Sequence, residues 1–267
     1  MRKIKLFLLT FLLGGCSLFQ HHDLNRVDQE KVGKSSQVPE RIELCDVFVG
    51  MSLGQPVKAS DEVGIEYFDD AAFIGDSRMV SINSMSNLTN ASVYAAVSMD
   101  LNKVFTKPII PMADGSLGYL LDALNQYQYG KVYMSFGLNE LGWYALDVFE
   151  EKYTELIQSV KFSQPNATIY LLDIFNISQD RIGGMSYHTL ERIKEVNDLI
   201  MKIAVDQGVN VIHMNEMLGG DDQYLPASLS SDGFHLNKDG FASWEHLIRT
   251  HVHVAEEVYE KRPCVNE

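Results

Sequence analysis

Three short stretches of the chain carry side chains whose types and spacing could support acyl transfer. The first, Gly-Asp-Ser-Arg, ends with Ser77 and Arg78, and the second, Gly-Leu-Asn-Glu, contains Asn139. In the third, Ser-Asp-Gly-Phe-His, Asp232 and His235 are three residues apart, so one compact turn can direct the carboxylate at an imidazole nitrogen. That contact would fix the tautomer and leave the other nitrogen free to take a proton from a serine hydroxyl.

Each stretch also has an ordinary structural interpretation. Gly, Asp, Ser and Asn are common in turns, so Ser77 or its neighbour Asp76 could simply cap a helix. Asn139 could form a turn, or its side-chain amide could donate a hydrogen bond to a negatively charged oxygen. His235 could be satisfied within an Asp-Gly turn. The chemical interpretation therefore depends on whether the fold brings the three stretches together.

The elements that would position these stretches alternate between buried strands and amphipathic helices. Four apolar runs predict buried strands, and a fifth, weaker run predicts another: residues 71–74, 132–136, 168–174, 209–213 and, for the weaker run, 92–97. Apolar residues at helical spacing predict helices over 117–127, 146–160, 190–203 and 241–258. This alternation favours one α/β domain with a parallel sheet covered on both faces, in which sites form at the carboxyl ends of the strands.

Taken in order, the three stretches resemble sequence blocks of the SGNH (GDSL) hydrolase superfamily. Gly75-Asp76-Ser77 is similar to its first block, Gly137-x-Asn139-Glu140 to its third, and Asp232-x-x-His235 to its fifth. The similarity covers residues 69–248 and looks most like a bacterial extracytoplasmic branch of that superfamily. The resemblance implies a three-layer, flavodoxin-like fold with a sheet of about five parallel strands.

The resemblance also implies a catalytic triad. Ser77 would be the nucleophile, His235 its general base, and Asp232 the group that orients His235. The oxyanion hole would combine the backbone N–H of Ser77 with the side-chain amide of Asn139.

The third oxyanion donor of the family is the backbone N–H of a glycine in a second block, where this chain departs from the pattern. Ser98 is the best match to that position, and Gly115 and Gly118 are alternatives. A backbone N–H does not require glycine, so the chemistry can survive the departure.

Other polar residues carry weaker signals. Arg78 could position an anionic substrate, or it could be a surface charge or half of an ion pair. His213 falls in a predicted strand and is interpreted as a satisfied core histidine, and His188 has no spacing that predicts a partner. The chain has neither a phosphate-binding G-x-x-x-x-G-K-[ST] motif nor a dinucleotide-binding G-x-G-x-x-G motif after a strand, so we predict no cofactor. We also predict no metal, because the paired aspartates at 69–70 and 221–222 lack the ligand spacing of an EF-hand.

The N-terminal 40 residues are predicted to be a targeting signal and a linker rather than part of the folded domain. Residues 1–15 have the basic head and apolar stretch of a signal peptide, and Leu-Gly-Gly-Cys, ending at Cys16, resembles the bacterial lipobox, whose cysteine is lipidated. Residues 16–40 then form a polar tether, and residues 41–267 form the hydrolase-like domain. These features predict an extracytoplasmic protein held at a bacterial membrane. Cys45 and Cys264, near the two ends of the domain, could form a disulfide.

Composition limits the partners. The 267-residue chain has 22 Lys and Arg against 36 Asp and Glu, for a formal charge of −14, which argues against binding nucleic acid. The resemblance to SGNH hydrolases, together with the predicted envelope location, implies a serine esterase that cleaves O-acyl esters, O-acetyl or short-chain, on carbohydrate or cell-envelope glycan. An O-acyltransferase with the same triad and a non-catalytic glycan-binding lipoprotein are the alternatives.

Overall fold

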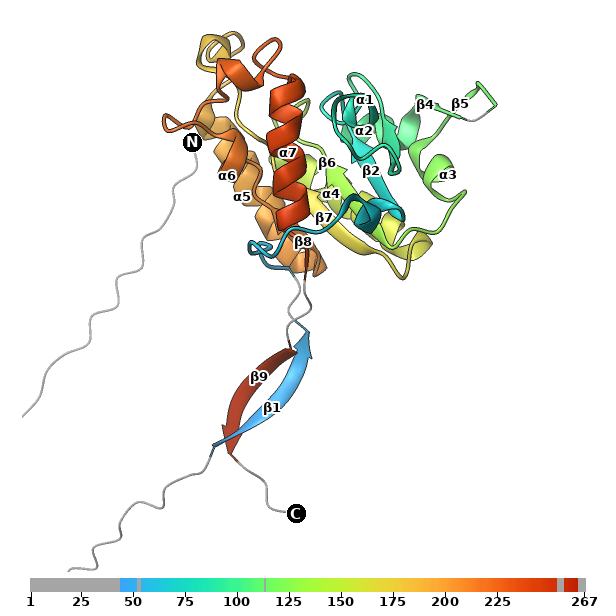
Figure 1. The fold of residues 1–267 in the computed structure, drawn as a ribbon, viewed down its shortest axis with the longest axis vertical. Helices are drawn as coiled ribbons and strands as arrows, with labels where there is room; N and C mark the ends of the chain where they lie inside the picture. The colour runs from blue at the N-terminus through green and yellow to red at the C-terminus, as the bar shows by residue number, and fades with distance from the viewer. Residues whose placement is uncertain (1–43, 52–53, 113, 254–256, 264–267) are drawn as a thin grey trace, which may run out of the picture. The chain divides into compact units, whose positions relative to one another are not determined.

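A five-stranded sheet forms the centre of the computed structural model, which describes residues 44–51, 54–112, 114–253 and 257–263 (Figure 1). The strand order is β3-β2-β6-β7-β8, and all neighbouring pairs are parallel. The strands are β2 (Ala71–Gly75), β3 (Ser92–Ala95), β6 (Lys131–Ser135), β7 (Thr168–Leu172) and β8 (Asn210–Ile212). All five predicted strands are confirmed, and their order along the sheet is that of flavodoxin-like folds.

The helices that cover this sheet agree with the sequence in part. They are α1 (Ile82–Met85), α2 (Leu101–Thr106), α3 (Leu120–Leu124), α4 (Leu146–Ser163), α5 (Leu190–Gln207), α6 (Asn215–Leu218) and α7 (Lys238–Thr250), with short 3₁₀ helices at Ile65–Phe68, Gln179–Arg181 and Ala227–Leu229. The helices predicted over 146–160 and 190–203 are confirmed as α4 and α5.

Two helix predictions are wrong in extent. Within the predicted helix 117–127, Leu117 instead pairs with Pro111 in an antiparallel hairpin of β4 (Ile110–Pro111) and β5 (Leu117–Gly118), so only α3 is helical. The helix predicted over 241–258 ends at Thr250, and its last two predicted residues, Glu257 and Val258, belong instead to β9 (Glu257–Pro263), which pairs with β1 (Leu44–Met51). Strand pairing has overridden the helical spacing of apolar residues in both places.

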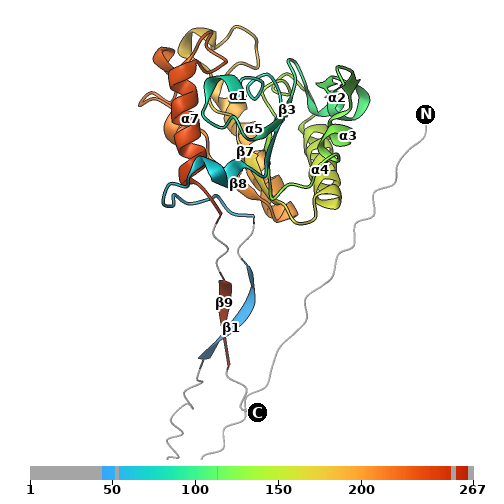
Figure 2. The same cartoon turned by 45° about the vertical axis from the view of Figure 1, so that its right-hand side comes forward.

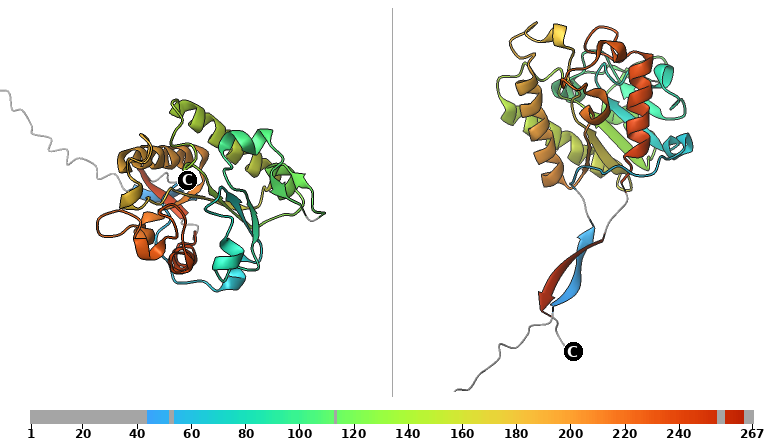
Figure 3. Two further views of the ribbon diagram at one scale, coloured as in Figure 1. Left: turned by 90° about the horizontal axis from the view of Figure 1, so that it is seen from above. Right: turned by 60° about the vertical axis from the view of Figure 1, so that its left-hand side comes forward.

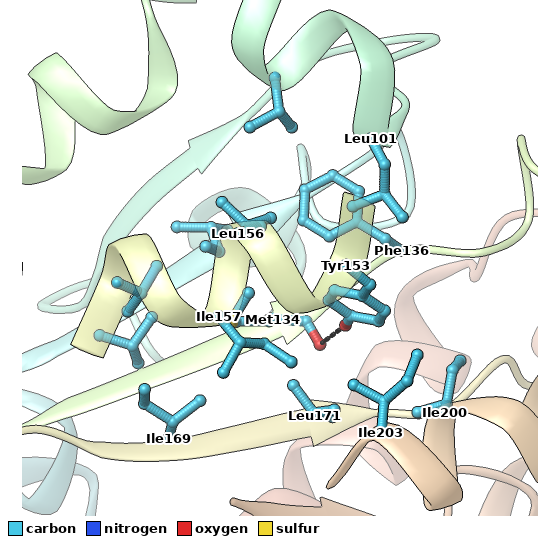
Figure 4. Packing of buried hydrophobic residues seen from close by; sticks show 14 of the residues in the cluster. Leu101, Met134, Phe136, Tyr153, Leu156, Ile157, Ile169, Leu171, Ile200 and Ile203 are labelled. Atoms are coloured by element: carbon cyan, nitrogen blue, oxygen red, sulfur yellow. Dashed lines mark hydrogen bonds between the residues drawn. The ribbon is translucent and has the colours of Figure 1, made fainter. Parts of the chain in front are cut away.

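Alternating side chains along the central strands supply two separate hydrophobic cores. Ala72 and Ile74 of β2 belong to the core beneath α2, α3, α4 and α5, part of which is drawn in Figure 4. Ala71 and Phe73 belong to the opposite core, beneath α1, α6 and α7. Figures 2 and 3 show α7 and α4 on opposite sides of the sheet. Because both faces are covered, β2 is apolar and buried along its whole length.

An aromatic stack crosses three strands in the second core. Phe73, Tyr133 and Tyr170 occupy paired positions on β2, β6 and β7, and adjacent ring centroids are 4.6 Å apart with nearly parallel planes. The Tyr170 hydroxyl is 3.4 Å from the Tyr67 hydroxyl and accepts the backbone N–H of His253 at 3.0 Å. The Tyr133 hydroxyl is buried and has no hydrogen-bond partner among the described residues. The two tyrosines therefore differ in what their hydroxyls contribute.

The sheet order creates a branch point beside β2. The chain moves from β2 to β3 on one side and later to β6 on the other, so the loops leaving these strands diverge from one place. Ser77, Ser98 and Asn139 follow β2, β3 and β6 respectively. Ligands bind at such switch points in open parallel sheets, which locates the candidate site.

The ends of the chain are described in part. β1 contains Cys45, whereas Cys264 lies outside the described residues, so their disulfide stays a prediction. The predicted signal peptide, Cys16 and the tether also lie outside them. In the part that is described, no helix has the length and apolar character needed to cross a membrane.

We predict opposite effects from removing the two stacked hydroxyls. Tyr133→Phe removes a buried polar atom without a partner and keeps the ring, so the free energy of unfolding should hold or rise by up to about 1 kcal/mol. Tyr170→Phe, the matched variant, removes a bonded hydroxyl and should lower it by about 1 kcal/mol. Urea denaturation measures both, and a clear loss of stability in Tyr133→Phe would contradict the assignment.

Candidate active site

A chain of hydrogen bonds joins the three predicted triad residues. Ser77 Oγ lies 2.8 Å from His235 Nε2, and His235 Nδ1 lies 2.7 Å from Asp232 Oδ2. Asp232 Oδ1 also accepts the backbone N–H groups of His235 and Phe234. Burial opposes ionisation of Asp232, but the hydrogen bonds from His235 and these N–H groups outweigh it and lower the pKa of Asp232 to about 2. The carboxylate beside His235 is therefore charged near neutral pH.

The turn that carries Asp232 and His235 depends on glycine. Gly233 has φ +85°, and a Cβ there would lie 2.3 Å from Ser178 Oγ and 2.5 Å from Arg181 Cγ. Arg181 Nε in turn donates to the Asp232 carbonyl at 2.7 Å. The turn thus packs directly against the segment that follows β7, and this contact positions the backbone of the turn that carries His235.

Arg78 anchors the same turn from below. Its Nε donates to the Phe234 carbonyl at 3.1 Å, its Nη1 donates to the Phe175 carbonyl at 2.8 Å, and its guanidinium carbon lies 3.6 Å from the centroid of the Phe175 ring. Burial lowers the pKa of Arg78 to about 10, although the charges of Asp76 and Asp232 oppose that shift. The three roles offered by the sequence are not supported. Arg78 is buried rather than a surface charge, forms no ion pair within the described residues, and does not line the cavity where a substrate would bind.

Ser98 has the backbone conformation in which glycine is usual. Its φ is +60°, a left-handed value that is uncommon for residues with a Cβ. Neither the Ser98 N–H nor the Ser77 N–H donates a hydrogen bond within the described residues. Ser98 lines the cavity over Ser77, whereas Gly115 and Gly118 lie in the β4–β5 hairpin and do not. Of the three candidates for the second-block donor, only Ser98 is at the site.

The side chain of Asn139 is held beside Ser98. Asn139 Nδ2 donates one hydrogen to the Met99 carbonyl at 2.7 Å, and the side chain lines the cavity. Since an amide NH₂ carries two hydrogens, the other can serve an oxygen in the cavity. Lys103 Nζ donates to the Ser98 carbonyl at 2.5 Å.

The buried carboxyl group of Glu140 accepts hydrogen bonds from the loops after β3 and β6. Glu140 Oε1 accepts the Leu101 N–H at 2.7 Å, and Oε2 accepts the Gly137 N–H at 2.9 Å. Burial raises the pKa of Glu140 to about 8, against the opposing effect of these N–H groups. Glu140 therefore links the loop after β3 to the loop after β6 without reaching the cavity.

A cavity of about 490 Å³ opens over the triad. Apolar and aromatic side chains form much of its wall, and the lining residues are Ser77, Val80, Ser81, Val97, Ser98, Leu138, Asn139, Tyr187, His188, Phe234 and His235. The arrangement places a serine hydroxyl, an imidazole and three hydrogen-bond donors around one cavity, and acyl transfer by a nucleophilic serine needs groups of these types.

Comparison with known families identifies the fold and its chemistry. A family model described as GDSL-like lipase/acylhydrolase matches residues 87–242, more than half of the chain. The chain belongs to this family. It is an SGNH hydrolase enzyme, as the sequence blocks indicated. The matched range contains Asn139, Asp232 and His235 but begins after Ser77. The inclusion of Ser77 in the site therefore depends on its hydrogen bond to His235.

Solved structures share the SGNH hydrolase fold at low sequence identity. A candidate platelet activating factor from Streptococcus pneumonia is 18% identical over 69% of this chain and 87% of its own, with a TM-score of 0.53. A GDSL-like lipase from Bacteroides thetaiotaomicron VPI-5482 is 14% identical over 69% and 88%, with a TM-score of 0.52. These likenesses establish the fold. A search of curated proteins returns no match to the chain.

Sequence reasoning misplaced or missed three residues of this SGNH hydrolase. His213 is not a core histidine, because its side chain is 38% exposed while its Nδ1 lies 2.8 Å from Asp173 Oδ2. The bridging role of Glu140 and the position of His188 on the cavity wall had no local signal, since both depend on segments distant in sequence. Within the described ranges, no group of three His, Cys, Asp or Glu side chains is placed to hold a metal ion.

The conformation of Ser98 generates a stability prediction. Ser98→Gly should leave the free energy of unfolding unchanged or raise it by up to about 1 kcal/mol, because relief of the left-handed strain offsets the entropy cost of glycine. Ser98→Val should lower it by at least about 1 kcal/mol, since a β-branched residue is disfavoured at φ +60°. Urea denaturation compares the two, and an equal loss in both would contradict the strain.

Glu140 generates a pH-dependent prediction. Its pKa rises from 4.5 to about 8 on folding, so between these values the unfolded chain has released a proton that the folded protein keeps. The contribution of Glu140 to stability is therefore full below pH 4.5 and falls as pH rises toward 8. Glu140→Gln removes this titration and leaves one N–H without an acceptor, which costs about 1–3 kcal/mol.

Urea denaturation at pH 5 and pH 8 tests this prediction. The stability difference between wild type and Glu140→Gln should be larger at pH 5 than at pH 8. Glu155→Gln, on the exposed surface of α4, is the matched control. Its stability difference from wild type should be the same at pH 5 and pH 8. A difference that stays constant across this range would show that Glu140 is ionised throughout.

Proposed function

We propose that this SGNH hydrolase is a serine esterase that cleaves O-acyl esters, acetyl or short-chain, on carbohydrate or cell-envelope glycan. The observation that carries the proposal is the continuous hydrogen-bonded chain from Ser77 Oγ through His235 to Asp232. It ends in a cavity that also holds Asn139 and Ser98. No separate element is needed to complete the arrangement for covalent catalysis.

The proposed reaction proceeds through an acyl-enzyme. His235 Nε2 takes the hydroxyl proton of Ser77 as Oγ attacks the ester carbonyl carbon, and the resulting oxyanion accepts hydrogen bonds from the N–H groups of Ser77 and Ser98 and from the Asn139 amide. His235 then gives its proton to the departing alcohol, which leaves the acyl group on Ser77. In the second half of the reaction, His235 Nε2 takes a proton from a water molecule as its oxygen attacks the acyl carbonyl carbon. His235 then returns that proton to Ser77 Oγ, so the acid is released and the Ser77 hydroxyl is restored.

Two features support the proposed substrate class. The cavity combines an apolar wall with polar groups near Ser77, which suits a small acyl group attached to a polar alcohol. The lipobox-like sequence ending at Cys16 supports a location at the cell envelope, where glycan esters would be available.

The lipid anchor is a separate proposal. We propose that Cys16 becomes the lipidated first residue of the mature protein, which would hold it outside the cytoplasm at a bacterial membrane. In cells fed radiolabelled fatty acid, the wild-type protein should incorporate label and fractionate with membranes. Cys16→Ala should incorporate none and should leave the membrane fraction, whereas retention of label would locate the acylation elsewhere.

Ester hydrolysis by purified protein tests the activity. We expect turnover of p-nitrophenyl acetate and butyrate to exceed that of the octanoate, and Ser77→Ala to lower kcat/KM by at least about a thousandfold. Ser84→Ala, which removes an exposed hydroxyl from the neighbouring helix α1, is the matched control and should behave as wild type. Activity that survives in Ser77→Ala, or a folded wild type that turns over no ester, would refute the serine esterase.

A further inference from the structure

His188 lies on the cavity wall and takes no part in the proposed triad. It belongs to the segment between β7 and α5, and its ring packs between two aromatic rings that also line the cavity. The Tyr187 ring is 4.9 Å away at 87°, and the Phe234 ring is 5.2 Å away at 59°. Because Phe234 directly precedes His235, this packing holds His188 close to the triad.

The two nitrogens of His188 have different surroundings. Nδ1 is buried and has no hydrogen-bond partner among the described residues, and it faces Gly184, where an added Cβ would lie 3.7 Å from it. Nε2 is not among the buried unpartnered atoms, and no hydrogen bond of the described residues engages it. Nε2 is therefore the nitrogen of His188 that stays accessible, in a residue that lines the cavity.

These surroundings select one form of the ring. Burial lowers the pKa of His188 below its ordinary value of 6.5, so the ring is neutral at pH 7 and carries one hydrogen. A buried N–H without an acceptor is rarer and less tolerated in proteins than an unpaired acceptor atom. The hydrogen is thus better placed on Nε2, which makes His188 an uncharged hydrogen-bond donor to the cavity.

We propose that His188 is a substrate-binding residue whose Nε2–H donates to an uncharged oxygen of the alcohol part of the ester, such as a sugar hydroxyl or ether oxygen. The proposal rests on the esterase function above and narrows its substrates to hydroxylated alcohols. An anionic oxygen fits less well, because the cavity is lined by no Lys or Arg of the described residues and the chain has a formal charge of −14. A few polar groups on an otherwise apolar wall typically set the orientation of a ligand.

Two substitutions separate the nitrogens of His188. The amide nitrogen of glutamine stands close to the position of Nε2, whereas that of asparagine stands close to the position of Nδ1. The full chain would therefore be compared as wild type, His188→Gln and His188→Asn. Met185→Ala, an exposed residue of the same segment that does not line the cavity, is the matched control.

Each protein would be assayed with phenyl acetate and with a mono-O-acetylated methyl glycoside. We expect His188→Asn to lower kcat/KM for the glycoside ester about fivefold more than for phenyl acetate, mainly through KM, since one neutral hydrogen bond is lost. His188→Gln should recover most of this difference, and Met185→Ala should show none. Equal changes for both substrates in His188→Asn, or no recovery in His188→Gln, would overturn the proposal.

A second measurement does not depend on turnover. Imidazole ¹⁵N shifts of the Ser77→Ala protein should show His188 protonated at Nε2 at pH 7, and the Nε2 signal should move when the acetylated glycoside is added. A ring protonated at Nδ1, or a signal that the glycoside leaves in place, would refute the role of His188. If wild type hydrolyses neither ester, the serine esterase fails, and this titration still decides whether His188 binds the glycoside.

Discussion

The position of β2 between β3 and β6 is the constraint on which the site depends. The hydrogen-bond register sets Gly75, at the end of β2, opposite Ala95 of β3 and Ser135 of β6. The three strands are parallel, so their loops leave the same edge of the sheet together. Ser77, Ser98 and Asn139, which we propose as nucleophile and oxyanion donors, therefore line one cavity without any long connection.

Two buried ionisable side chains beneath this edge stabilise the geometry of the loops. Arg78 and Glu140 are almost wholly buried, and each is bonded to backbone groups of two segments that meet at the site. Removing a charge from water is unfavourable, as the lowered pKa of Arg78 and the raised pKa of Glu140 both show. The hydrogen bonds of Arg78 to two carbonyls and of Glu140 to two backbone N–H groups offset part of this cost. They also link segments that meet at the site.

The cavity wall adds a layer of recognition to this machinery. The turn of Asp232 and His235 brings Phe234 with it, and Phe234 in turn packs against His188. The proposed triad residues Asp232 and His235 and the proposed substrate-binding residue His188 are therefore held by one compact unit. Strain is concentrated nearby at Ser98, where a side chain occupies a backbone conformation usually reserved for glycine.

The sequence by itself determined the fold class and the identities of the triad candidates. Buried strands are marked by runs of apolar residues that avoid water, and the triad candidates lie in three short blocks that match the family in order, so both could be recognised from neighbouring residues. Only the tertiary structure decided the partners of Arg78, Glu140 and His188, because their contacts join segments that are far apart in sequence. It also ended α7 at Thr250 and divided 117–127, where pairing of Leu117 with Pro111 in a hairpin outweighs the helical pattern. Burial by distant segments, not local pattern, decided what each of these residues does.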